Sequence, residues 1–242
     1  RIEGLEPEWM CLQHFVPRRA PELQCVYVFF SSRRKAAEVF DEMLDCQFIV
    51  TRLEAQGFKV ECVNMCKSMD RNTFLRYDVV ITGDPIDCEA MHQSAQMALH
   101  NFIRRGKGIV MWQGVTGPLL KEPYMPFTAW AMADDSDEEV MLAAGRVETL
   151  IFEQENHPVF NGIDPNPQWG NRRAKVTLRD RSRVLARWQD GVPHLVENES
   201  GRVLCFTSPK AFLPSEVSVQ EQQLFVNAVL YCARQDTQPI DA

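Results

Sequence analysis

The sequence predicts an α/β protein whose central sheet is mostly parallel and is covered by helices on both faces. Through the first half of the chain, short apolar runs rich in β-branched residues alternate with segments of helical periodicity. Such alternation implies parallel strands joined by right-handed crossovers. The chain has 242 residues, 45% of them hydrophobic, so it can bury a full core in one large domain.

The predicted α/β domain begins with a β-α-β unit. The run 24–30 (QCVYVFF) is β-branched and aromatic throughout, which is typical of a strand buried on both faces. Apolar residues then recur at helical spacing over 34–56, and Gly57 follows in the position of a C-cap glycine. The next strand is predicted at 58–64.

Two further strands and a long helix complete the first half. A short amphipathic piece, 70–77, precedes a strand at 78–83, a helix at about 87–105 and a strand at 108–112. Ligands of open parallel sheets bind beyond the carboxyl ends of the strands. The loops of interest are therefore Ser31–Ser32, Gly83–Asp84–Pro85 and Gln113–Gly117.

The pattern changes after Pro118. Prolines, Trp130 and an acidic run predict an irregular insertion up to about Glu139. Five short strands follow, at 147–152, 174–178, 183–188, 192–196 and 202–207. Asp190–Gly191 predicts a hairpin turn between two of them.

A final helix is predicted at about 218–234. Its core positions are Leu224, Phe225, Ala228, Val229 and Cys232. The predicted organisation is an N-terminal arm (1–23), one α/β domain (24–234) and a C-terminal tail (235–242).

Composition restricts the classes of partner. A net charge of −7 opposes general binding to nucleic acid or anionic membranes, because phosphate binding needs concentrated Lys and Arg. No apolar run reaches the length of a membrane helix, and the first residues lack the order of a signal peptide. These features favour a cytoplasmic protein.

Cysteine usage and short motifs indicate no metal or cofactor. Several of the eight cysteines lie in apolar runs, as expected for reduced, buried thiols. Cys62 and Cys66 have no second Cys/His pair at zinc spacing, and the chain has neither a G-x-G-x-x-G nor a Walker sequence.

Several segments together resemble class I glutamine amidotransferase-like domains, and within them the ThuA-like (trehalose utilisation) branch. The segments are YDVVITGD at 77–84, FIRRGKGIV at 102–110, HPVFNGI at 157–163, the stretch 183–209 and QLFVNAVLYCAR at 223–234. The resemblance implies a flavodoxin-like three-layer α/β/α sandwich, here with extra β-hairpin strands in the C-terminal third. It also implies that the turn after strand 108–112 corresponds to the turn that holds a nucleophilic cysteine in active relatives.

That turn carries Gln113, and no cysteine lies between Cys88 and Cys205. Glutamine hydrolysis needs a thiolate, a histidine and an orienting acid. The active family has a His-x-Glu near its end, whereas the nearest local match here is His194 with Glu197. In a regular strand this spacing sends the two side chains to opposite faces, so we do not expect glutaminase activity.

The candidate ligand-binding residues are Trp112, Gln113, Gly114, Asp84, His157 and Ser208. An indole at position 112 suits stacking on a sugar or base, although it equally suits packing between sheet and helix. No catalytic residue is assigned; His157 and Asp84 are the candidates. His157 can act as an acid or base near neutral pH, but His-Pro followed by Asn-Gly is also a good turn.

Two functions remain open on the sequence alone, beside a third possibility, a purely structural subunit without a ligand. The first is a catalytically degenerate amidotransferase-like domain, a pseudoenzyme that binds or assembles with another protein or a second copy of itself. The second is a ThuA-like enzyme that acts on a carbohydrate, with a sugar as its ligand. Convergence of His157, Asp84 and Gln113 on one reacting atom would favour the enzyme.

Overall fold

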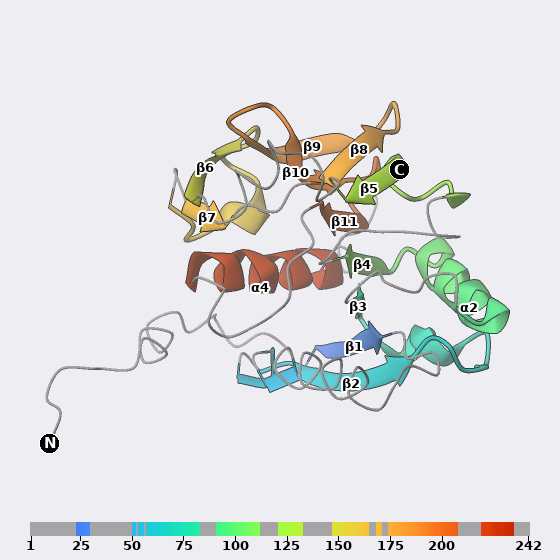
Figure 1. Cartoon of the computed structure of the whole chain (residues 1–242). Helices are drawn as coiled ribbons and strands as arrows, with labels where there is room; N and C mark the ends of the chain where they lie inside the picture. The colour runs from blue at the N-terminus through green and yellow to red at the C-terminus, as the bar shows by residue number, and fades with distance from the viewer. Residues whose placement is uncertain are drawn as a thin grey trace, which may run out of the picture.

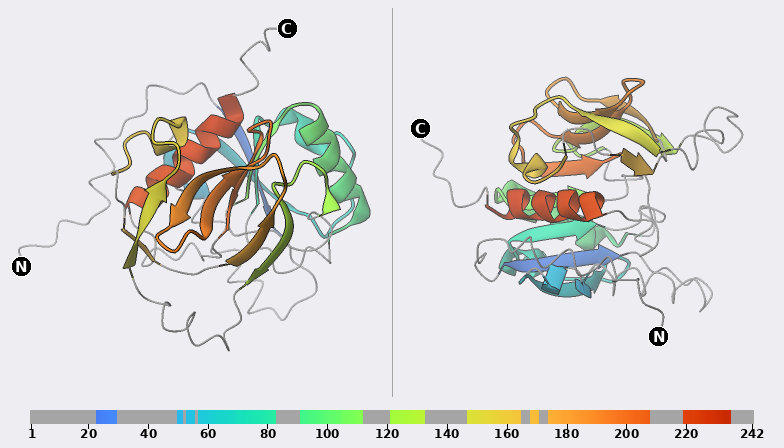
Figure 2. Two further views of the ribbon diagram at one scale, coloured as in Figure 1. Left: turned by 90° about the horizontal axis from the view of Figure 1, so that it is seen from above. Right: turned by 90° about the vertical axis from the view of Figure 1, so that its left-hand side faces the viewer.

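A computed structural model describes residues 23–29, 50–51, 53–55, 57–82, 91–111, 121–132, 147–164, 168–170, 174–207 and 219–234. Within these ranges the chain forms a nine-stranded sheet, with helices α2 and α4 on opposite faces (Figure 1). The views in Figure 2 show the same layering from above and from the side. The predicted terminal arms lie outside the described residues, apart from Leu23.

Five adjacent strands of the sheet are parallel. They are β2 (Lys59–Asn64), β1 (Gln24–Phe29), β3 (Val79–Thr82), β4 (Gly108–Met111) and β11 (Val203–Phe206), in that spatial order. Taken in chain order, this is the 2-1-3-4-5 arrangement of flavodoxin-like sheets. The predicted α/β class and mostly parallel core are confirmed.

The other four strands extend the sheet in antiparallel fashion. They are β10 (Pro193–Glu197), β9 (Arg183–Trp188), β6 (Val147–Phe152) and β7 (Gln168–Gly170). The predicted hairpin joins β9 to β10, and Gly191 adopts a φ of 86° in its turn. That positive φ is the left-handed conformation that glycine adopts without strain.

The described helices begin and end for local reasons. The first predicted helix is described only near its end, where Gly57 (φ 86°) donates its N–H to Glu54 O. Helix α2 spans Gln93–Arg104, so it starts later than the predicted residue 87: His92 is its N-cap and accepts the Ser94 N–H. The amphipathic piece at 70–77 forms a short 3-10 helix, η2 (Thr73–Arg76).

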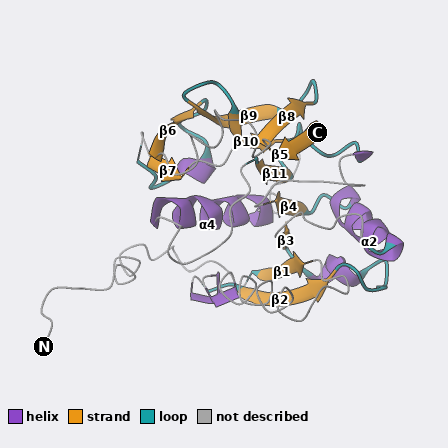
Figure 3. Ribbon diagram, viewed as in Figure 1, coloured by secondary structure: helices purple, strands orange, loops and turns teal. Residues whose placement is uncertain are grey.

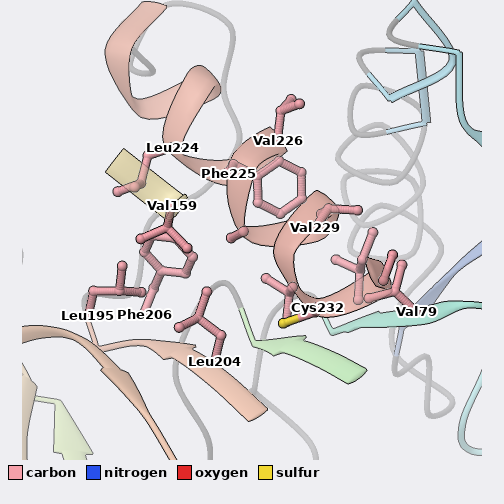
Figure 4. Close-up of a cluster of buried hydrophobic side chains, with 14 of the residues drawn as sticks. Val79, Val159, Leu195, Leu204, Phe206, Leu224, Phe225, Val226, Val229 and Cys232 are labelled. Carbon is pink, nitrogen blue, oxygen red and sulfur yellow. The ribbon is translucent and has the colours of Figure 1, made fainter. Parts of the chain in front are cut away.

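Helix α4 (Val219–Arg234) covers one face of the sheet, as predicted. Its buried residues Leu224, Phe225, Val229 and Cys232 meet side chains of the strands in Figure 4. The approach is closest at Gly108, where an added Cβ would lie 2.4 Å from Cys232 O. The absence of a side chain at this position therefore allows the helix to reach the start of β4.

The opposite face is covered by α2 together with a two-stranded ribbon. The ribbon pairs β5 (Phe127–Met132) with β8 (Ala174–Leu178), and Phe127 is fully buried in the core on the α2 side. Figure 3 shows these two strands on that side of the sheet. Part of the predicted irregular insertion is thus a strand, because its apolar residues pack on the core. The short edge strand β7 was also not predicted.

Candidate functional site

At the carboxyl edge of the sheet, the strands β3, β4 and β11 end side by side, next to the start of β10. Thr82 ends β3 and lies opposite Met111, the last residue of β4, which in turn lies opposite Cys205 of β11. Thr207 follows β11; its N–H donates to His194 O at 2.8 Å and its hydroxyl donates to Pro193 O at 2.6 Å. These bonds attach the end of β11 to the start of β10.

Five of the six predicted ligand-binding residues follow this edge but lie outside the described residues: Asp84, Trp112, Gln113, Gly114 and Ser208. The chain enters these loops from three adjacent strands, β3, β4 and β11. Their predicted convergence is therefore compatible with the topology of the sheet. Two of the three residues that the enzyme hypothesis requires, Asp84 and Gln113, lie outside the described residues.

His157 is the sixth candidate, and its side chain is buried. It is the N-cap of a short 3-10 helix, η5 (Pro158–Phe160), and its Nδ1 accepts the Val159 N–H at 3.4 Å. A neutral imidazole that accepts at Nδ1 carries its proton on Nε2. The ring packs edge-on against Tyr231 of α4, with centroids 4.6 Å apart.

His157 Nε2 points to a second buried group, the carboxylate of Glu197 at the end of β10. The distance from Nε2 to Oε2 is 3.7 Å, which is longer than a hydrogen bond. The Tyr231 hydroxyl donates to the same Oε2 at 3.2 Å, and Arg183 Nη2 lies 2.7 Å from Oε1. Glu197 has no exposed surface, whereas about half of the Arg183 side chain is exposed.

Burial dominates the proton affinities of this group. Desolvation, assisted by the nearby Arg183 charge, lowers the pKa of His157 to about 4. Desolvation raises the pKa of Glu197 despite the opposing effects of Arg183 and Tyr231. It also raises the pKa of Tyr231 to about 12, helped by the Glu197 charge. At neutral pH His157 and Tyr231 are therefore uncharged.

This arrangement suits anchoring better than catalysis. The His157 lone pair is used by the Val159 N–H, so the ring is not an available base. Its contacts are to η5, β10 and the last turn of α4, and Cys232 of that turn packs on Gly108 at the start of β4. His157 thus lies on the side of the sheet where β4 starts, at Gly108, rather than where it ends, at Met111.

No family model and no curated protein matches the chain. Solved structures do match. A ThuA-like protein of Bacteroides uniformis superposes with a TM-score of 0.62 at 12% identity, over 88% of this chain and 92% of its own. A ThuA-like protein of Parabacteroides merdae gives 0.62 at 11% identity, over 91% and 93%. A glutamine amidotransferase of Thermotoga maritima gives 0.51 at 7% identity, over 91% and 87%.

The chain has the fold of ThuA-like proteins and class I glutamine amidotransferases. At these identities the match concerns the fold alone. It confirms the predicted resemblance at that level, including antiparallel strands in the C-terminal part of the sheet.

The thiols near the centre of this amidotransferase-like sheet are poor nucleophiles. Cys205 and Cys232 are fully buried, and burial raises the pKa of each well above that of a free cysteine. Burial likewise raises the pKa of Cys25 on β1. A protonated thiol does not attack a carbonyl carbon, because the thiolate is the reactive form.

The side chains of His194 and Glu197 do not point in the directions that the sequence predicted. Two register shifts interrupt the β9–β10 pairing, at Pro193/Leu195 and Leu195/Val196. As a result, the His194 ring packs against Trp188 in the core under α4, and Glu197 also faces α4 through Tyr231. The prediction that the side chains of His194 and Glu197 point to opposite faces of the sheet was wrong, because these bulges break the alternation of side chains along the strand.

The roles of Glu197, Tyr231 and Arg183 in one cluster were not predicted. The only usable signal was an acid in an otherwise apolar strand, since such a residue requires buried partners. Among the described residues, no group of three His, Cys, Asp or Glu side chains could hold a metal ion. No described helix is long and apolar enough to cross a membrane.

Proposed function

We propose that this chain is a catalytically degenerate amidotransferase-like domain that serves as a binding or assembly module in the cytoplasm. Its partner is another protein or a second copy of the chain. The observation that carries the proposal is at the end of β4: the strand ends at Met111, and the residues after it are Trp112, Gln113 and Gly114. An amide is not a nucleophile for acyl transfer.

The rest of the site supports the same proposal. The buried thiols of β1, β11 and α4 are held in the protonated form. His157, which lies near the buried acid Glu197, has its Nδ1 lone pair bound to a backbone N–H. A framework that keeps the fold while losing these reactive groups suits recognition rather than turnover.

An ammonia-release assay with glutamine tests the loss of catalysis. We expect no turnover above the buffer blank for the purified chain, for Gln113→Cys or for Gln113→Ala, with an active amidotransferase as the positive control. Turnover by the unmodified chain that disappears in Gln113→Ala or His157→Ala would refute the proposal.

The assembly part is tested by sedimentation velocity over a wide range of protein concentration. Self-association with a defined stoichiometry supports a second copy as the partner. A monomer at every concentration excludes the homo-oligomer, and cross-linking of the tagged chain in its native cells then has to recover one reproducible protein partner. Failure of both assays removes the assembly proposal.

The ThuA-like matches favour one alternative, an enzyme that acts on a carbohydrate. They have higher TM-scores than the amidotransferase match, 0.62 and 0.62 against 0.51, and cover 88% and 91% of the chain against 91%. In this alternative Trp112 stacks on a sugar ring, and Asp84, Gln113, Gly114 and Ser208 supply polar contacts. The loops in question follow neighbouring strands of the sheet.

Tryptophan fluorescence tests the alternative directly. Titration with mono- and disaccharides is expected to quench the protein's emission in a saturable manner, and Trp112→Phe removes that response. Trp188→Phe is the matched control, because Trp188 is fully buried under α4. If no sugar changes the emission, or if both variants respond alike, the carbohydrate site is excluded.

A further inference from the structure

The region around His157 has features that neither proposed function uses. Its helix η5 contacts α4 through two separate attachments. One is the His157 ring on Tyr231, and the other is Asn227, whose Nδ2 donates to Val159 O at 2.9 Å and Asn161 O at 2.8 Å. Val159 and Phe160 of η5 are thereby buried in the core under α4.

The N-cap of η5 depends on the protonation state of one ring nitrogen. His157 Nδ1 must be unprotonated to accept the Val159 N–H. Once protonated, both ring nitrogens are donors, so Nδ1–H would face N–H. The cap and the neutral ring therefore exist together, and a proton on the ring abolishes the cap.

Burial prevents the ring from simply turning to water. His157 is 9% exposed, and its ring lies between Tyr231 and Phe160. His92 provides a natural contrast: its Nδ1 also accepts an N–H two residues later, from Ser94, but the side chain is exposed. The exposed His92 ring can rotate into solvent, whereas protonation of the buried His157 ring requires movement of the surrounding structure.

The charged and titratable groups around His157 come from each element packed against it. Glu197 on β10 is the nearest acid, and Arg183 on β9 neutralises it from the other side. Tyr231 and Cys232 on α4 are both uncharged at neutral pH, since burial raises the pKa of each. The Glu197 charge is thus already balanced by Arg183 and offers limited compensation to a protonated His157.

We propose that His157 is an acid-operated latch: the neutral ring holds η5 against α4, and protonation of the ring releases η5. The hydrogen bonds that Asn227 donates to Val159 O and Asn161 O must also break for η5 to leave α4, so the opening is confined to this contact and leaves the sheet intact. The open state exposes the apolar side chains of Val159 and Phe160. Opening at acid pH agrees with the pKa of His157, which burial lowers to about 4 in the closed state from about 6.5 in a solvated ring.

Amide hydrogen exchange resolved to single residues tests the latch. The reporters are the N–H groups of Val159, Phe160 and Ile163, which bond to His157 Nδ1, His157 O and Phe160 O. After correction for intrinsic exchange, their protection should fall roughly thirtyfold between about pH 7.5 and pH 5, because the open state binds the proton more tightly. Amides of β3 and β4 should not follow this change.

The variant His157→Gln separates the latch from general acid effects. Glutamine can accept the Val159 N–H but does not titrate in this range, so the protection of η5 should become independent of pH. His92→Gln is the matched control and should keep the wild-type pH dependence. Equal pH dependence in the wild type and His157→Gln overturns the proposal, as does a parallel loss of protection in β3 and β4.

A measurement on the unmodified chain covers the case in which His157→Gln does not fold. Long-range proton–nitrogen NMR correlations identify the tautomer and the titration of each histidine ring. The latch requires an unprotonated Nδ1 on His157 at neutral pH and titration well below 6.5, coincident with shifts of the Val159 amide. A proton on Nδ1 at neutral pH, or titration near 6.5, rules the latch out.

Discussion

Both faces of the sheet bury a hydrophobic cluster, but the charged groups beside the two clusters differ in their exposure. Under α4, a carboxylate with no exposed surface, Glu197, lies beside a buried histidine. On the α2 side, His100 Nδ1 lies 2.9 Å from Glu122 Oε2 at the rim, with side chains 36% and 19% exposed. A buried charge makes stability depend on protonation, whereas a rim pair is screened by solvent. The stability of the α4 face should therefore be the more sensitive to pH.

The largest expected effect is the pH dependence of the free energy of unfolding. The pKa of His157 is about 4 in the folded chain and about 6.5 when solvated, so the unfolded chain takes up the proton first as the pH falls. This contribution therefore lowers stability between about pH 6.5 and pH 4, by roughly 3 kcal/mol in full. Urea denaturation across this range measures it.

Glu197 acts in the opposite direction, because its pKa is raised in the folded chain and protonation there favours folding at acid pH. The difference between the wild type and His157→Gln isolates the histidine, since Glu197 is present in both. A difference that does not change with pH would mean that the two faces respond to acid alike.

The second prediction concerns the contact between α4 and β4. Gly108→Ala places a Cβ within 3 Å of three Cys232 atoms, two of them backbone, so helix and strand must separate. We expect a loss of about 1–3 kcal/mol in the free energy of unfolding. Gly191→Ala is the control: its φ is 86° with no atom within 4 Å of the added Cβ, so only backbone strain should appear. Equal losses would show that the close approach is unimportant.

The third prediction concerns the second attachment of η5. Asn227→Ala removes the donor to two carbonyl oxygens, those of Val159 and Asn161. Leaving a buried acceptor without its donor costs about 1–3 kcal/mol. Chemical denaturation at neutral pH should report this loss, and exchange of the η5 amides should increase even where His157 is neutral. Gln223→Ala, which removes only the contact to Asn227 Oδ1, should have a smaller effect.

The smallest effect belongs to the α2 face. His92→Ala removes an exposed N-cap of α2, and we expect a loss of about 0.5–1 kcal/mol in thermal or urea unfolding. Because the ring is exposed, its loss should hardly alter the pH dependence of stability. If His92→Ala changed that dependence as strongly as His157→Gln, burial would not be what distinguishes the two faces.

The parallel part of the sheet could be predicted from sequence because each element carries its own signal. The strand at 24–30 is a continuous apolar run, and Gly57 marks the end of a helix through its left-handed backbone. Strand β8 was also predicted, at 174–178, whereas its partner β5 lacked such a signal: Phe127 of β5 is buried because it covers a core supplied by distant segments. Local periodicity does not contain that information.

Part of the candidate site could be predicted from the sequence, and part could not. The lack of a cysteine after β4 follows from the sequence and the strand order, so the resemblance to amidotransferases already led to the prediction that glutaminase activity is absent. The cluster around Glu197 did not follow, since its members come from separate elements and a bulge reverses the expected facing of His194. Contacts between residues that are remote in the sequence arise only when the chain folds.

What the sequence determined by itself was the alternation of strands and helices, the apolar face of α4 and the amide at position 113, because each is a local property of consecutive residues. The tertiary structure alone decided that His157 would be buried beside Glu197 and Tyr231. Burial sets the proton affinity of an imidazole, and burial is a property of the packed chain rather than of any segment of it.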